Sequence, residues 1–221
     1  MPVTILEERS AGAATVRGTV LFADLRGYTA LAERLSPLSV VALLEEFFSL
    51  LADAVEGGQG TVFHSAGDSI MAGFGLSELD AEPVRCAVAA GRRIVASFAP
   101  VSERWQRRVG VATGVGVGLH VGELALAELG PAHFRRRTLI GDTVNVAARL
   151  CQRARAGEVL LSASVAEALD GSATGDVIAL PALTLRGRGM PVPIYCVPAR
   201  ERILIERPLQ GAPGGAPSPL G

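Results

Sequence analysis

The chain has 221 residues, of which 49% are hydrophobic, and its formal net charge is −1. A chain of this length and composition can form one domain with a substantial core. The near-neutral charge provides no general attraction to polyanions, so we expect no nucleic-acid partner.

We also expect no membrane segment and a cytoplasmic location. The most apolar stretch, residues 109–121, is too short and too rich in glycine for a membrane span. The first ten residues, MPVTILEERS, carry acids where a signal peptide needs a basic start. The three cysteines, Cys86, Cys151 and Cys196, lack metal-ligand spacing and indicate reduced thiols.

The first predicted element is a strand over residues 18–23, an apolar run that ends on the carboxylate of Asp24. A turn leads into a predicted helix over 36–55, which has Pro37 in its first turn and apolar residues at helical spacing. The glycines of the sequence GGQG end that helix.

A hairpin is predicted next, with strands over 60–63 and 69–74. Gly67 allows a tight turn between them, and Asp68 follows it. A second helix is predicted over 83–98, because this segment opens with a proline and continues with regularly spaced apolar residues.

The next predicted strand, residues 115–121, has one bulky face and one nearly bare face. Its odd positions are Val or Leu, whereas Gly116 and Gly118 stand between them. The bare face predicts that a helix or another chain approaches closely. His120 on that face is a candidate base, but a structural hydrogen bond is the favoured interpretation.

Residues 139–150 lead into a helix that carries Asn145 and Arg149 four positions apart, and therefore on one face. The remaining predicted elements are a strand over 158–162, a short helix over 164–169, and closing strands over 183–186 and 194–197. This order indicates the α/β (α+β) class, with a mainly antiparallel central sheet flanked by helices.

Two acids and a pair of polar side chains on one helix together indicate phosphoryl transfer. Asp24 and Asp68, brought together by the fold, would bind Mg2+ or Mn2+. Paired metals about 3.5–4 Å apart can stabilise both the attacking and the leaving oxygen of an in-line displacement. The Asn145 amide can orient a ribose, and the planar Arg149 guanidinium can neutralise charge on a phosphoryl oxygen.

Three motifs in this order resemble the catalytic domain of class III nucleotidyl cyclases, the adenylate and guanylate cyclase family. They are FADLRGYT, GDSIMAGFG and GDTVNVAARL, and the resemblance covers about residues 17–198. It implies a ferredoxin-like palm, with a mainly antiparallel sheet flanked by helices. Residues 1–16 are then an N-terminal extension, and residues 199–221 are a Gly/Pro-rich tail that we expect to be disordered at its end.

The resemblance also implies roles for single residues. Asp24 and Asp68 match the two metal-binding aspartates, and the backbone carbonyl of Leu25 is a further expected ligand of two Mg2+ or Mn2+ ions. Asn145 and Arg149 match the pair that orients the ribose and stabilises the transition state. The residues expected to contact the nucleoside triphosphate are Arg26, Gly27, Tyr28, Thr29, Gly67 and Arg186. Arg186 stands where the family commonly has a polyphosphate-binding lysine, and it keeps the positive charge.

Two positions depart from the adenine-reading pattern of the family. Adenylate cyclases have a Lys four residues before the second metal Asp, and an Asp or Thr two residues before the Thr-x-x-Gly-Asp stretch; here they are His64 and Arg136. Arg136 only donates, so it suits guanine or uracil oxygens better than the adenine amino group. A register slip would place Arg135 or Arg137 there instead. Many bacterial members with unusual residues here still make cyclic AMP, so ATP is the expected substrate, and GTP or a pyrimidine triphosphate is the alternative.

The resemblance further implies a homodimer. In the family, the metal aspartates come from one subunit and the base, ribose and phosphate contacts come from the other, so two copies of this chain would complete two sites. The expected reaction is attack of the ribose 3′-oxygen on the α-phosphorus with loss of pyrophosphate, in second-messenger signalling. The alternative is a catalytically silent regulatory module, although such modules usually lose a metal aspartate or the transition-state arginine, and this chain keeps both.

Overall fold

The computed structural model describes residues 13–77, 81–169, 177–184 and 191–198. The strands of the described residues are β1 (Ala13–Arg26), β2 (Thr61–Ala66), β3 (Ser69–Phe74), β4 (Gly114–Leu129), β5 (Arg136–Ile140), β6 (Glu158–Ser162), β7 (Ile178–Leu183) and β8 (Val192–Pro198). They form one sheet in the order β2-β3-β1-β4-β6-β8-β7, and β5 pairs with β4 outside that path. All of these pairs are antiparallel except β4 and β6, which run parallel.

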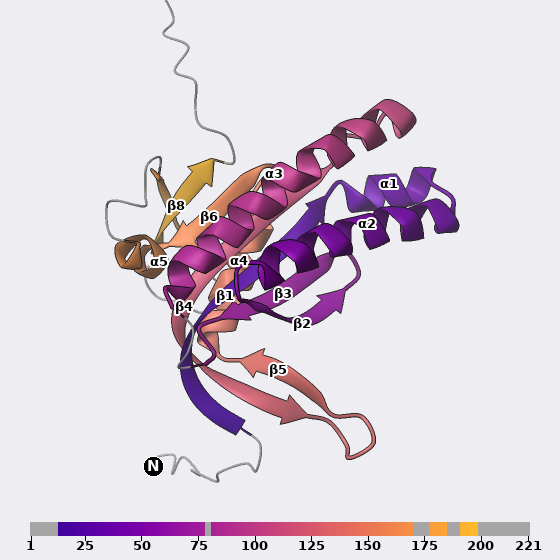
Figure 1. The fold of residues 1–221 in the computed structure, drawn as a ribbon. Coiled ribbons are helices and arrows are strands. Elements are labelled where there is room, and N and C mark those ends of the chain that lie inside the picture. The colour runs from indigo at the N-terminus through magenta and orange to yellow at the C-terminus, as the bar shows by residue number, and fades with distance from the viewer. Residues whose placement is uncertain (1–12, 78–80, 170–176, 185–190, 199–221) are drawn as a thin grey trace, which may run out of the picture.

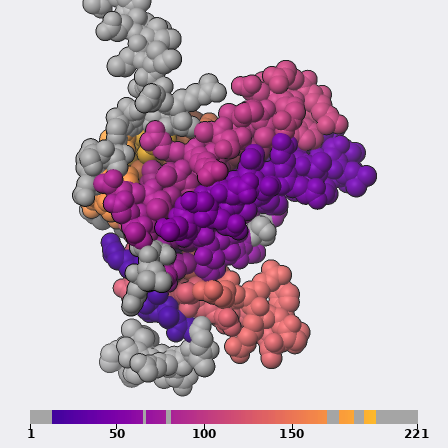
Figure 2. Space-filling view, viewed as in Figure 1, coloured from indigo at the N-terminus to yellow at the C-terminus, as the bar shows by residue number. Residues whose placement is uncertain are grey.

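The helices of the described residues are α1 (Tyr28–Arg34), α2 (Pro37–Glu56), α3 (Pro83–Val109), α4 (Asp142–Arg153) and α5 (Ala163–Ala168). α2 and α3 lie side by side over one face of the sheet (Figure 1), and α4 packs on β1 and β4. The ribbon of β4 and β5 extends beyond the sheet and stands out from the rest of the molecule (Figure 2). The expected mainly antiparallel sheet flanked by helices is confirmed. None of the helices in the described ranges is both long and apolar enough to span a membrane.

Local sequence explains where α2 begins. Ser36 is the N-cap, and its side chain accepts a hydrogen bond from the backbone N–H of Ser39. Pro37 occupies the first helical position, where a missing N–H removes no intrahelical bond. The predicted helix over 36–55 is therefore confirmed to within a residue at each end.

α3 is longer than predicted. It continues past Pro100, which lies inside the helix, and ends only before Gly110 in a left-handed conformation with φ 70°. The predicted end at residue 98 was wrong because Val101 and Trp105 extend the buried stripe of the helix. Their burial offsets the hydrogen bond that the proline removes.

Several strands also depart from their predicted bounds, and β5 was not predicted. β1 and β4 pair from Ala13 with Ala127 to Arg26 with Gly114, so both exceed the apolar runs that predicted them. The ladder continues through positions that mix apolar and polar side chains and vary in exposure, so the apolar runs alone do not mark its ends. β7 begins at Ile178, ahead of the predicted closing strand over 183–186, of which residues 185 and 186 lie outside the described residues; the side chains of β7 are exposed or half-buried and give only a weak apolar pattern.

Alternation along β1 separates the main core from the opposite face of the sheet. Leu21 and Leu25 belong to the core under α2 and α3. Val20 packs in a separate cluster that includes a residue of α4. Because successive strand residues face opposite sides, Asp24 and Arg26 lie on the α4 face.

The bare face of β4 is where α4 packs, as the glycine pattern predicts. A Cβ built on Gly118 would lie 2.1 Å from the backbone nitrogen of Cys151 and 2.6 Å from the carbonyl oxygen of Ala147. The other face of the strand places Val117 and Leu119 in the main core. Only a glycine at position 118 permits this approach of helix to strand.

The substitution Gly118→Ala should therefore destabilise the protein by roughly 3 kcal/mol, because the added methyl group meets backbone atoms. The matched control is Gly67→Ala, whose Cβ would have no neighbour within 4 Å and which strains only a left-handed turn with φ 58°. That strain costs about 1–2 kcal/mol. Urea unfolding of both variants gives the comparison, and equal midpoints would contradict the close packing of α4.

Candidate metal and nucleotide site

The two aspartates meet near the end of β1. The turn between β2 and β3 contains Gly67 in the left-handed conformation, and Asp68 follows it. The backbone N–H of Leu25 donates to the carbonyl oxygen of Asp68 over 3.0 Å, and Asp24 is the register partner of Ser69. The structure thus brings the two acidic segments together, and their role as metal ligands stays a prediction.

The electrostatic setting of Asp24 favours a bound cation. Burial raises the pKa of this carboxyl above its ordinary value, the Arg26 guanidinium opposes the rise, and the charge of Asp68 adds to it. A positive charge beside Asp24 offsets the repulsion between its carboxylate and the charge of Asp68.

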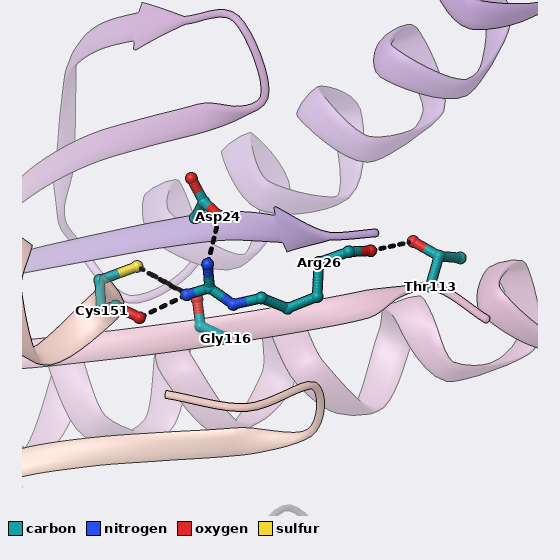
Figure 3. A network of polar contacts seen from close by, with 5 residues as sticks. All are labelled: Asp24, Arg26, Thr113, Gly116 and Cys151. Carbon is teal, nitrogen blue, oxygen red and sulfur yellow. Dashed lines mark hydrogen bonds and ion pairs between the residues drawn. The ribbon is translucent and has the colours of Figure 1, made fainter. Parts of the chain in front are cut away.

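Arg26 is the cation that Asp24 contacts in this structure (Figure 3). Its Nη1 donates to Asp24 Oδ1 over 2.5 Å, and its Nη2 donates to the carbonyl oxygen of Cys151. The Thr113 Oγ1 donates to the carbonyl oxygen of Arg26 over 2.8 Å. From the sequence, Arg26 is expected only to contact the triphosphate. The i,i+2 spacing from Asp24 on a strand was the signal for the contact between the two side chains.

These residues fit divalent metal ions. Asp24 and Asp68 supply hard oxygen ligands, and Asp24 holds a cation even without a metal. In the described part of the chain, no group of three or more His, Cys, Asp or Glu side chains could hold a metal. Backbone carbonyls, among which that of Leu25 is the predicted one, or substrate phosphates commonly complete the coordination of Mg2+.

α4 carries Asn145 and Arg149 on the side that faces away from the sheet. The opposite side of this helix is buried against the strands, whereas Asn145 is exposed and Arg149 is half-buried. The first turn is anchored to β4, because Thr143 Oγ1 donates to the carbonyl oxygen of Glu123 over 2.6 Å. The pair therefore lies on a rigid element but points away from the sheet that carries the two aspartates.

The turn after β1 has a backbone that only glycine suits. Gly27 adopts φ 78° and is the N-cap of α1, which starts at Tyr28. A Cβ on Gly27 would also lie 2.6 Å from the carbonyl oxygen of Ala112. Gly27 and Thr29 are exposed. Contact of this turn with a triphosphate stays a prediction.

The predicted base-reading residues lie on two strands that are close in space. His64 is exposed on β2, which lies near β5. The Arg136 guanidinium on β5 lies 4.5 Å from the centroid of the Phe134 ring. Thr138, which the sequence analysis did not single out, lies on the same face of β5 because it is two residues further on. Arg186 lies outside the described residues.

His120 has the structural role that the sequence analysis favoured. Its Nδ1 lies 2.7 Å from Ser162 Oγ and 3.3 Å from Ser164 Oγ. Ser162 also caps α5, where its side chain accepts from the backbone N–H of Val165. These bonds tie β4 to the start of α5.

Two acidic segments joined within a mostly antiparallel sheet, with an Asn and Arg pair on the covering helix, are the arrangement expected of a nucleotidyl cyclase catalytic domain. Residues 13–196 match the family described as the adenylate and guanylate cyclase catalytic domain. The chain belongs to this family, the class III nucleotidyl cyclases.

Two curated relatives carry the name of an activity. The adenylate cyclase of Anabaena cylindrica is 30% identical over 151 residues, which are 66% of this chain and 29% of that protein. Adenylate cyclase 1 of Rhizobium meliloti (strain 1021) is 33% identical over 137 residues, which are 60% of this chain and 20% of that protein. The chain thus spans less than a third of either relative.

Solved structures share the fold. The adenylyl cyclase CyaB from P. aeruginosa has a TM-score of 0.79 and 25% identity, covering 86% of this chain and 97% of that one. The guanylyl cyclase Cya2 has a TM-score of 0.74 and 26% identity, covering 84% and 93%. Cyclases named for two different substrates match this fold, so the fold does not select the base.

The three cysteines should differ in reactivity. Burial raises the pKa of the Cys151 thiol to about 12 and also raises the pKa of Cys196, whereas Cys86 is half-exposed. Since the thiolate reacts, iodoacetamide at pH 8 should label Cys86 first and Cys151 last, with roughly one Cys151 thiol in 10⁴ ionised. Mass spectrometry of timed samples gives the order. Equal rates in the folded protein, as in the urea-unfolded control, would contradict this reading.

Proposed function

We propose that this chain converts ATP to 3′,5′-cyclic AMP and pyrophosphate at a site shared by two copies. The observation that carries the proposal is the junction of the two acidic segments, where the Leu25 N–H is bonded to the Asp68 carbonyl beside Asp24. The choice of ATP is supported by the two relatives that are named adenylate cyclases.

The reaction needs one bond to form and one to break. The ribose 3′-oxygen attacks the α-phosphorus, its proton passes to solvent, and pyrophosphate leaves with the electron pair of the broken P–O bond. Two bound divalent ions would lower the pKa of the 3′-hydroxyl and offset triphosphate charge. Asp24 and Asp68 would hold these ions, Asn145 would orient the ribose, and the Arg149 guanidinium would neutralise charge that develops on the phosphoryl oxygens.

The placement of the residues supports a site between two chains. Asn145 and Arg149 lie on the outer side of α4. Asp24 lies on the other side of this helix, where Arg26 bonds both to Asp24 and to the Cys151 carbonyl of α4. One chain therefore directs its Asn and Arg pair away from its own metal aspartates. A second copy related by a two-fold axis supplies the missing half to each site. Second-messenger signalling in the cytoplasm is part of this proposal.

A second candidate function is cyclisation of GTP or a pyrimidine triphosphate. It is favoured by Arg136, which stacks on Phe134 and offers only donors to a base. Thr138, on the same face, favours ATP instead, because its hydroxyl both donates and accepts and so suits the adenine amino group. A catalytically silent module is less well supported, since both aspartates and the Asn and Arg pair are present.

Product analysis tests the proposal. Purified protein is incubated with ATP, GTP, CTP or UTP, with Mg2+ or Mn2+, and the products are identified by mass spectrometry. We expect cyclic AMP, and a loss of roughly 100-fold or more in the matched variant Asp24→Asn, because a carboxylate that holds the metals is removed. Cyclic GMP or a cyclic pyrimidine nucleotide would support the second candidate, and no product at all would support a silent module.

Mixing two inactive variants tests the shared site. Asp24→Asn and Asn145→Ala each damage both sites of a homodimer, but one mixed dimer contains one intact site. Random pairing of equal amounts should restore about a quarter of the wild-type rate, since half of the dimers are mixed and each has one site of two. The control is a mixture of Asp24→Asn and Asp68→Asn, which should restore none. Equal rates in the two mixtures would argue against a site between chains.

A further inference from the structure

The side chain of Arg26 is the part of the site that the proposed reaction leaves unexplained. It extends from the end of β1 along the α4 face of the sheet (Figure 3). Nη1 donates to Asp24 Oδ1 over 2.5 Å, and Nη2 donates to the carbonyl oxygen of Cys151, with the Cys151 sulfur 3.7 Å away. One guanidinium thus joins a predicted metal ligand to the last turn of α4.

The neighbouring strand is shaped to admit this guanidinium. A Cβ on Gly116 of β4 would lie 2.7 Å from both Nε and Nη2 of Arg26. Glycine at this position leaves room for the side chain to lie flat against the strand. The backbone of Arg26 is held as well, because Thr113 Oγ1 donates to its carbonyl oxygen over 2.8 Å. The contact therefore rests on features of β1, β4 and α4.

The same guanidinium is incompletely satisfied. Within the described part of the chain, its Nε is buried and has no hydrogen-bond acceptor. The Arg26 and Asp24 side chains retain 24% and 28% of their exposure, so solvent reaches the pair. A cation that is partly hydrated and lacks one of its bonds can be displaced more readily than a fully bonded one.

A divalent ion and the guanidinium compete for the same carboxylate. An ion that binds Asp24 meets a positive charge within hydrogen-bond distance of its ligand, and the two cations repel each other. This repulsion weakens the ion pair between Arg26 and Asp24 and favours movement of the guanidinium away from the carboxylate. The second bond of Arg26, to the Cys151 carbonyl, is made by the same rigid fork and cannot stay unchanged when the fork moves.

We propose that Arg26 is a built-in counter-cation: it pairs with Asp24 in the metal-free chain and releases Asp24 when a metal ion binds. Its bond to the Cys151 carbonyl then transmits this release to α4. The proposal rests on the proposed function, because it takes Asp24 as a metal ligand. α4 carries Asn145 and Arg149, which in the proposed dimer serve the other site. Metal loading of one site is thereby coupled to the helix that completes its neighbour.

The first test measures metal binding without nucleotide or turnover. Mn2+ alone is titrated into the protein and followed by water-proton relaxation. Arg26→Gln should lower the Kd for Mn2+ by roughly tenfold, because it removes one positive charge from beside the ligand. Arg107→Gln is the matched control, since it removes an arginine from an exposed ion pair with Glu103 on α3 and should leave the Kd unchanged. Asp24→Asn should abolish binding.

The second test measures coupling to α4. Hydrogen–deuterium exchange of the segment 147–153 is compared with and without Mn2+. We expect the exchange rate of the wild type to change by roughly twofold or more on metal binding, and that of Arg26→Gln to stay constant. Arg26→Lys keeps the charge but not the planar fork, so its Kd should stay near that of the wild type while the exchange response is lost. These two readouts separate a positioning role from simple loss of packing.

The outcomes separate the inference from the proposed function. If Asp24→Asn abolishes Mn2+ binding but Arg26→Gln binds as the wild type does, the counter-cation role is overturned and the metal site stands. If the exchange response to Mn2+ is the same in Arg26→Gln and the wild type, coupling to α4 is overturned. If Asp24→Asn binds Mn2+ normally, or the wild type binds none, both the inference and the metal site fail.

Discussion

The site depends on one steric constraint, the direct contact of α4 with the glycine face of β4. A side chain at Gly118 would collide with the backbone of Cys151 and Ala147, so the helix can lie against the strand only when that side chain is absent. This approach brings the Cys151 carbonyl within reach of Arg26 and fixes which side of the helix presents Asn145. Hydrophobic packing on the other face of β4 holds the strand in place while the bare face receives the helix.

Much of the fold could be predicted because its signals are local. The alternating valines and glycines of β4 identify a strand with two different faces, and Gly67 before Asp68 identifies the hairpin turn. The far end of α3 could not be predicted in this way, since Pro100 is a local helix-breaking signal. Only the tertiary burial of Val101 and Trp105 overrides it. Hydrophobic patterning also underestimates strands whose outer ends are exposed.

The candidate site likewise has parts that local sequence predicts and parts that depend on the tertiary structure. The sequence predicts that the fold brings Asp24 and Asp68 together, and the pairing of β1 with β3 joins the two segments. The contacts of long, flexible side chains cannot be derived from sequence spacing alone. Arg26 has several possible acceptors until the position of α4 is known. The contact of the Arg136 guanidinium with the Phe134 ring also follows from the fold of the β4–β5 ribbon, and the base-reading role of Arg136 stays a prediction.

The two faces of β4 also determine how this domain can change length during evolution. Deleting one residue between Val115 and Val121 would turn the bulky side chains toward α4 and the glycines toward the main core. Such a deletion would remove the core contacts and the helix contact together, and no single substitution could restore both. The loop between β4 and β5, residues 130–135, has no such constraint because it extends beyond the sheet. Insertions and deletions among homologous chains should therefore collect in that loop and be absent from the strand that precedes it.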